Sequence, residues 1–236
     1  MSSLPPQRRP LSMEKGKESA IPSYMVEVLT TEHSALQSAR FGTISEKNGR
    51  ASMYLGAVSS SVVALAFIAS ISESGPIFLA FALVILPVLF LMGLLTFGRL
   101  VQIGIADARF LVSINRIRHF YVKIAPEVND YLTLQIHDDA HGLTQPAMQS
   151  SAWWQRFLST AAIVAAVNSI IGGVVGAVAL GWVAHFDIAQ SVLAGILVGG
   201  VAFLLHVIVR RQMGRSYQNQ KEVRFPTPPD VHAEDA

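Results

Sequence analysis

The sequence predicts an all-α membrane protein with four transmembrane helices in two hairpins and a cytoplasmic two-helix stalk. The chain of 236 residues is 51% hydrophobic and only 14% charged, whereas soluble domains carry about 25% charged residues. Four stretches contain no Asp, Glu, Lys or Arg, and all 18 Lys and Arg residues lie outside them. These three observations predict the fold class.

The four charge-free stretches are the predicted spans, and they cover residues 51–72, 74–98, 157–186 and 188–209. At about 1.5 Å per residue, a helix of about 22 residues reaches about 33 Å, which is enough for a hydrocarbon core of about 30 Å. A helix of a soluble bundle would show a polar residue at every third or fourth position, and these stretches do not. We therefore expect all four to cross the bilayer.

The Lys and Arg residues predict the orientation of the spans. They occur before the first span, between the second and third, and after the fourth, while the turns at 72–76 and 185–187 contain none. Because basic residues are enriched on the cytoplasmic side, we expect both termini and the middle segment in the cytoplasm. The predicted location is the plasma (cytoplasmic) membrane, with the lipid bilayer as the first partner.

Polar, proline-containing sequence at both ends of the chain predicts disorder there. The predicted segments are a disordered cytoplasmic tail (1–22), the stalk helices with the first transmembrane hairpin (23–125), a cytoplasmic connector (126–155), the second transmembrane hairpin (156–216) and a second disordered cytoplasmic tail (217–236).

A helical seam follows the second span and predicts the stalk. Its members recur at alternating spacings of four and three: Ile103, Asp107, Phe110, Ile114, Ile117, Tyr121 and Ile124. Such spacing is typical of helices packed along a seam. We expect the second span to continue as one helix that packs antiparallel on the helix preceding the first span. Asp107 interrupts the seam and needs a partner there, for which Arg40 and Lys47 are the candidates.

Glycines one turn apart occur in both later spans, as Gly172 and Gly176 in the third and Gly195 and Gly199 in the fourth. Small residues at this spacing let helix backbones approach closely inside a membrane. They predict packing faces, either between the two spans or between copies of the chain, and we expect a homo-oligomer.

Polar side chains inside the spans have two interpretations. Ser59, Ser60 and Ser61 lie near the middle of the first span, and Asn168 lies near the middle of the third. They can bond to a carbonyl one turn earlier or to another helix, or they can line a pore formed in an oligomer. His206, near the end of the fourth span, is expected to reach the interface.

The segment QIHDDAHGL is the one candidate metal site. On a helix, His137 and His141 would lie one turn apart, the spacing of paired imidazole ligands, and the alternative is a solvated loop. The sequence has no cysteine, no glycine-rich phosphate loop and no nucleophile elbow. The basic row Arg109, Arg116 and Lys123 is interpreted as a solvated helix face, a site for lipid headgroups or a site for a nucleotide, and it has no interleaved aromatics for base stacking. We therefore expect no enzyme activity, no cofactor and no nucleic-acid partner.

The order of features in SEKNGRASMYLGAVSSSVVALAFI resembles that of small bacterial integral-membrane proteins of unknown function. There a cytoplasmic helix ends in an Asn-Gly-Arg-type step and enters a first span rich in Ser and Ala. Residues 24–125 are also similar, more distantly, to the two-span membrane effectors of bacterial nucleotide-signalled antiphage systems. Neither resemblance supplies a catalytic motif.

Two hypotheses for the function follow from these features. The first is a non-enzymatic membrane protein that forms oligomers and acts as an interaction or signalling component with a cytoplasmic protein partner. The alternative is a pore-forming or membrane-disrupting effector or channel.

Overall fold

The computed structural model describes residues 21–71, 75–143 and 159–228. This part of the chain is helical and contains no strand, which confirms the all-α class. Its elements are the helices α1 (Ser23–Ile71) and α2 (Pro76–Ile124), the short 3₁₀ helix η1 (Pro126–Tyr131), and the helices α4 (Thr160–Val183) and α5 (Ile188–Gln220). Each of the four α-helices is long and apolar enough to cross a membrane, as expected for a multi-pass membrane protein.

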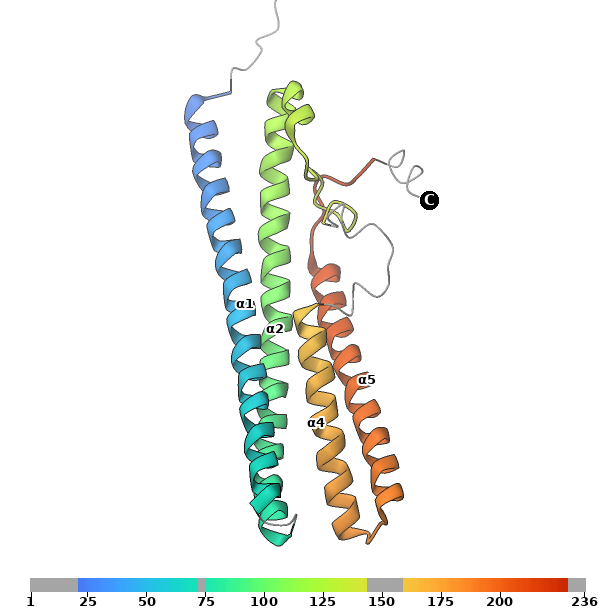
Figure 1. The fold of residues 1–236 in the computed structure, drawn as a ribbon. Coiled ribbons are helices and arrows are strands. Elements are labelled where there is room, and N and C mark those ends of the chain that lie inside the picture. Colours follow the sequence, from blue (N-terminus) through green and yellow to red (C-terminus); the bar gives the residue numbers. More distant parts are fainter. Residues whose placement is uncertain (1–20, 72–74, 144–158, 229–236) are drawn as a thin grey trace, which may run out of the picture.

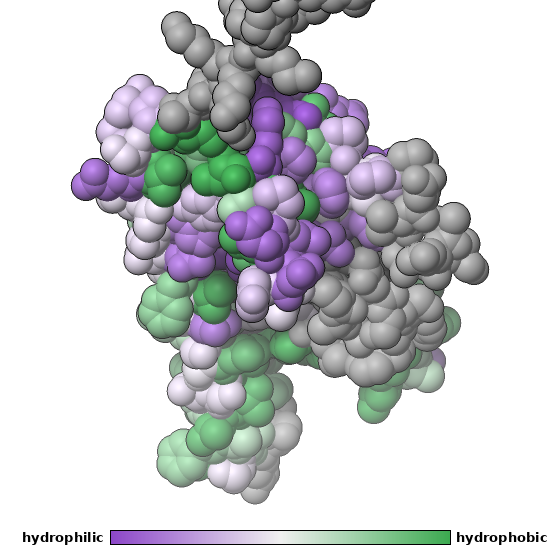
Figure 2. All heavy atoms as spheres, turned by 90° about the horizontal axis from the view of Figure 1, so that it is seen from above, coloured by the Kyte–Doolittle hydropathy of each residue, from purple (hydrophilic) through white to green (hydrophobic). Residues whose placement is uncertain are grey.

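The four α-helices form a bundle in which α1 packs on α2 and α4 packs on α5 (Figure 1). Helix α2 also packs on α4 and so joins the two pairs. Helices α1 and α2 run in opposite directions and continue well past the first turn of α4 (Figure 1). We call this continuation, residues 23–50 of α1 and 99–124 of α2, the charged extension. Figure 2, which looks down on this end of the molecule, shows hydrophilic residues gathered there and mainly hydrophobic ones farther away.

Local sequence explains where the helices begin and end. Pro76 occupies the first turn of α2, where its missing N–H costs no hydrogen bond, and Pro126 follows the last residue of α2 by two positions. The Ser159 side chain accepts a hydrogen bond from Ala162 N at the start of α4. Asp187 caps α5 in a reciprocal capping box with Gln190.

Glycines set the close approach of α4 and α5. A Cβ on Gly173 would lie 2.6 Å from Gly195 O, and one on Gly199 would lie 3.0 Å from Ser169 O. Gly176 meets Val198 in the same interface. The structure therefore places these glycine contacts between α4 and α5 of one chain.

Gly172 faces a different neighbour. A Cβ on Gly172 would lie 2.7 Å from Cε2 of Phe90 on α2. The two glycines of the predicted pair in the third span therefore serve different interfaces.

The seam of α2 faces α1 in the charged extension. Arg40 Nε lies 2.8 Å from Asp107 Oδ1, and the His33 and Tyr121 rings lie 6.0 Å apart. Arg40 is thus the residue that the structure brings to Asp107, while Lys47 faces a small cavity instead. With side chains 23% and 33% exposed, the ion pair is screened by water and contributes about 1 kcal/mol or less.

The predicted tail from residue 217 onward is wrong over residues 217–228. Helix α5 continues to Gln220, Phe225 and Thr227 bond to Asp138 and Asp139 of a loop near α2, and Glu222 O accepts a hydrogen bond from Arg116 of α2. Residues 229–236 lie outside the described part of the chain, as do residues 1–20 and 144–158.

Candidate functional site

A buried polar cluster links α1, α4 and α5. Tyr54 Oη donates to Asn168 Oδ1 at 3.2 Å, and Asn168 Nδ2 lies 3.4 Å from His206 Nε2. His206 Nδ1 lies 2.7 Å from the carbonyl oxygen of Ala202. With the Asn168 amide oriented this way, His206 Nδ1 donates to the Ala202 carbonyl oxygen and His206 Nε2 accepts from the Asn168 amide.

Helix α2 closes this cluster with a glycine and an aromatic ring. A Cβ on Gly93 would overlap the Asn168 side chain and lie 2.7 Å from Tyr54 Oη, so only glycine fits there. The Phe97 ring meets the His206 ring edge-on, with centroids 4.6 Å apart. Tyr54 and Asn168 are fully buried and His206 is 5% exposed. The cluster therefore fixes the register of all four helices.

The intramembrane residues singled out from the sequence do not meet in this structure. Asn168 bonds within the bundle, whereas Ser59 and Ser60 are exposed on the outer side of α1 and Ser61 is half-buried. A path lined by these serines and Asn168 together is not formed within one chain. The expectation that His206 reaches the interface is also wrong, because its ring is enclosed by α2 and α4.

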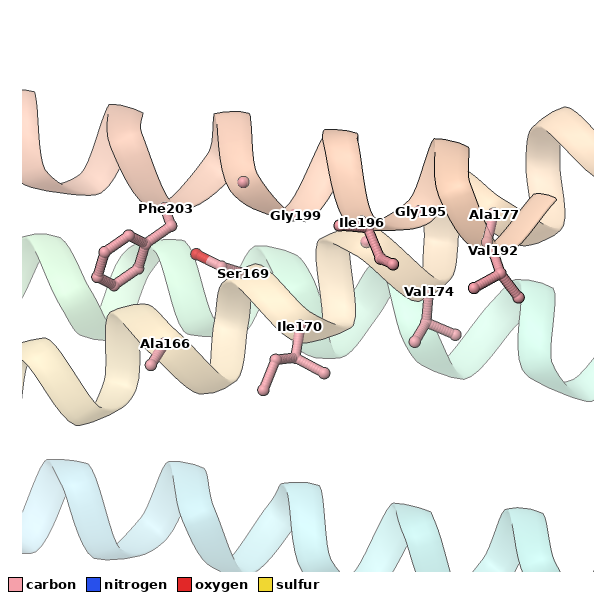
Figure 3. Close-up of a pocket in the computed structure, with 12 residues that line it drawn as sticks. Ala166, Ser169, Ile170, Val174, Ala177, Val192, Gly195, Ile196, Gly199 and Phe203 are labelled. Atoms are coloured by element: carbon pink, nitrogen blue, oxygen red, sulfur yellow. The ribbon is translucent and has the colours of Figure 1, made fainter. Parts of the chain in front are cut away.

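A groove of about 600 Å³ lies between α4 and α5 (Figure 3). Its described lining is apolar apart from Ser169, with Ile170 and Val174 contributed by α4 and Ile196 by α5. The Ser169 hydroxyl already donates to Ala165 O at 2.7 Å. The groove thus offers an apolar surface and no reactive side chain.

The His/Asp segment forms a clasp around the chain that follows α5. Asp138 is fully buried and accepts hydrogen bonds from Arg116 Nε at 2.7 Å, Phe225 N at 2.8 Å and Arg224 N at 3.1 Å. Asp139 accepts from Gly142 N at 2.8 Å. We call this contact of residues 137–142 with residues 222–227 the clasp.

A second set of contacts anchors the clasp on α2 and on the chain beyond α5. Asp139 also accepts from Thr227 N at 2.7 Å and from its hydroxyl at 2.9 Å. Asn115 Nδ2 donates to His137 O and Gly142 O at 2.8 and 2.9 Å. The His119 ring stacks on the Phe225 ring, with centroids 4.0 Å apart.

Hydrogen bonding controls the charge of the clasp. Burial would raise the pKa of Asp138, but the bonds from Phe225 N, Arg116 and Arg224 N outweigh it and hold that pKa below its ordinary value of 3.8. Burial would also raise the pKa of Asp139. The hydrogen bonds from Gly142 and Thr227 outweigh this effect, so the pKa of Asp139 is lowered as well. Both carboxylates are therefore ionised and serve as acceptors for backbone N–H groups.

The predicted metal pair is not supported. The chain at 132–143 is irregular and ends in a turn at 140–143 rather than forming a helix, so the one-turn spacing of His137 and His141 does not apply. Across the described ranges, no group of three or more His, Asp or Glu side chains could hold a metal ion. The helix expected for this segment does not form, and Gly142 N instead bonds to Asp139 Oδ1 within a turn.

The outer side of α1 carries a repeat of small residues that we call the serine–glycine face. Its members alternate at spacings of four and three and are all exposed: Ser38, Gly42, Ser45, Gly49, Ser52, Gly56 and Ser59. No other part of the described chain lies within 4 Å of a Cβ built on Gly42, Gly49 or Gly56. This face points away from α2 over the whole length of the repeat, in the apolar half of α1 and in the charged extension.

Comparisons with protein-family models, with curated proteins and with solved structures give no match to this chain. Its role is therefore inferred from its own contacts.

The sequence reasoning missed Tyr54, Gly93 and the serine–glycine face. The heptad SxxxGxx, repeated three times between Ser38 and Gly56, is visible in the sequence, but a search for large apolar residues does not detect it. Tyr54 and Gly93 carry no local signal, because their partners lie on other helices.

Proposed function

We propose that this chain is a non-enzymatic multi-pass membrane protein that pairs with a second copy of itself through α1 and acts as an interaction or signalling component. The charged extension is then the cytoplasmic stalk, and both termini face the cytoplasm, because the Lys and Arg residues are confined to that side. The carrying observation is the serine–glycine face, which continues unbroken from the apolar half of α1 into the charged extension.

Large apolar residues extend the serine–glycine face of α1 at both ends. Tyr24, Val28 and Val63 fall on its spacing and are 67%, 61% and 69% exposed. In the charged extension, where water surrounds the helix, exposed side chains of this kind on one seam favour a covered surface. The serine–glycine face and these apolar residues together define one continuous strip without a charged residue.

The length of the strip and the spacing of its residues indicate which kind of helix can pack on it. A spacing of four and three is the repeat of left-handed supercoiled helices, and glycine and serine allow close backbone contact. The partner must be a long helix that crosses the same boundary from apolar to charged sequence. Helix α1 of a second copy meets both conditions, since it offers the same strip in the same register.

Cysteine cross-linking tests this pairing in a chain that has no cysteine of its own. We expect Ser52→Cys and Ser59→Cys in native membranes to form disulfide-linked dimers on mild oxidation, because both positions lie on the strip. Ser60→Cys is the matched control: Ser60 is also exposed but lies off the strip, and this variant should stay largely monomeric. Electrophoresis without reductant gives the readout.

Equal cross-linking at Ser59→Cys and Ser60→Cys would indicate random collision and would overturn the pairing. A membrane-inserted Ser52→Cys variant that forms no dimer would also overturn it, since the strip would then face lipid or another protein. Adding Gly49→Leu to Ser52→Cys should abolish the dimer, because a large side chain would hold the two helices apart.

A further inference from the structure

A second cavity, of about 260 Å³, lies where the helices pass from charge-free to charged sequence. All four α-helices or their caps contribute to its lining. Among the lining residues are Lys47 of α1, Leu100 and Gly104 of α2, Ser159 at the start of α4, and Arg210 and Gly214 of α5. In the proposed arrangement this level is the cytoplasmic edge of the bilayer.

Two basic side chains line the cavity. Lys47 and Arg210 enter it from different helices, and no carboxylate is among its described lining residues. Within the described chain Lys47 makes no ion pair or side-chain hydrogen bond, and the neighbouring carboxylates are engaged elsewhere. Glu46 lies 3.0 Å from Arg99, and Asp107 lies 2.8 Å from an arginine of α1. The charge of Lys47 is therefore available to an anion.

The rest of the lining suits an anion that carries an apolar body. The start of α4, capped by Ser159, directs the positive end of a helix dipole toward the same space. Leu100, Val101 and Ile105 supply an apolar wall. Gly104 and Gly214 leave room, since no described atom outside their own helix lies within 4 Å of a Cβ built on either.

We propose that this cavity binds a phosphate group, held by Lys47 and Arg210, and that its source is the headgroup of an anionic phospholipid. Basic pockets between transmembrane helices at the cytoplasmic side bind anionic headgroups through this chemistry. The apolar wall favours a lipid, although a soluble phosphate compound would use the same two cations. The site rests on the proposed four-span arrangement but not on the pairing of copies.

Thermal unfolding of the detergent-solubilised protein tests the site with three additives. Phosphatidylglycerol should raise the unfolding temperature in a saturable manner, whereas phosphatidylcholine, which carries no net charge, should raise it far less. Inorganic phosphate is the third additive. A shift with inorganic phosphate that Lys47→Gln removes would support the phosphate site and assign it to a soluble compound.

Two variants separate charge from space. Lys47→Gln should raise the phosphatidylglycerol concentration needed for half the shift by about fivefold to tenfold. Gly104→Leu should abolish the shift by filling the cavity while keeping both cations. The matched controls are Lys123→Gln, at the exposed end of α2, and Gly98→Leu, whose Cβ position is also open. Both controls should respond as the unaltered protein does.

The proposal is overturned if neither phosphatidylglycerol nor inorganic phosphate gives a saturable shift, or if all four variants respond equally. Failure of the proposed function looks different. A chain that is washed from membranes by alkaline carbonate would contradict the four-span arrangement. A chain that binds phosphatidylglycerol but gives no Ser52→Cys dimer would lose only the pairing.

Discussion

Replacement of Gly93 by alanine should destabilise the folded bundle by about 2–3 kcal/mol. The added methyl group would occupy the space of the Asn168 amide and crowd Tyr54 Oη. To make room, Asn168 must move away from Tyr54, to which it bonds at 3.2 Å, or α2 must move away from α4. Either movement leaves a polar group unpaired inside an apolar bundle, which is costly.

Thermal unfolding in detergent measures this effect, with Gly98→Ala as the matched control on the same helix. A Cβ on Gly98 has open space, so its replacement should be neutral or slightly stabilising through helix propensity alone. Gly93→Ala should lower the unfolding temperature by roughly 5–10 °C relative to Gly98→Ala. Equal unfolding temperatures for the two variants would show that the cluster does not fix the helix register.

Composition and spacing were sufficient to predict the helices themselves. A run without charge that is long enough to span a bilayer has few alternatives, and the four predicted spans lie within α1, α2, α4 and α5 or overlap them. The seam containing Asp107 also identified its pairing surface, because a carboxylate on a packed face requires a partner. The choice between Arg40 and Lys47 depended on how far α1 is shifted along its axis relative to α2, which a single sequence does not specify.

Contacts between distant parts of the chain were beyond the sequence. The bond from Tyr54 to Asn168 joins residues 114 positions apart, and the bond from Phe225 to Asp138 joins residues 87 positions apart. Periodicity describes one helix at a time, so it predicts which face is buried but not which residue of another helix meets it. The pair His137 and His141 was a candidate metal site for this reason, whereas the aspartates between them accept hydrogen bonds from backbone N–H groups near residue 225.

Replacement of Asp138 by asparagine should open the clasp while leaving the helical bundle intact. Asp138 accepts bonds from Arg116, Arg224 and Phe225, and an amide group cannot accept all of them. Loss of charged hydrogen bonds at a buried site costs about 2 kcal/mol, which corresponds to about thirtyfold in the opening equilibrium. Hydrogen exchange of the Arg224, Phe225 and Thr227 amides, which the clasp bonds, should speed up by that factor, whereas exchange in the four α-helices should not change.

The pH dependence of the clasp follows from the same contacts. Because the pKa of Asp138 is lowered by folding, its contribution is fully present above its ordinary value of 3.8 and is lost as the pH falls through the folded pKa. Burial, together with the nearby His137 and Lys123, lowers the pKa of His119 and so favours its neutral form. Acid therefore also weakens the stacking of His119 on Phe225, starting below the ordinary His119 pKa of 6.5. Protection factors for the Arg224, Phe225 and Thr227 amides, corrected for intrinsic exchange, should therefore fall in two stages, the first below pH 6.5 as His119 gains a proton and the second below pH 3.8 as Asp138 does. Asp130→Asn is the matched control, since Asp130 is exposed outside the clasp. If Asp138→Asn and Asp130→Asn gave the same protection at pH 7, the segment after α5 would be held by something other than the clasp.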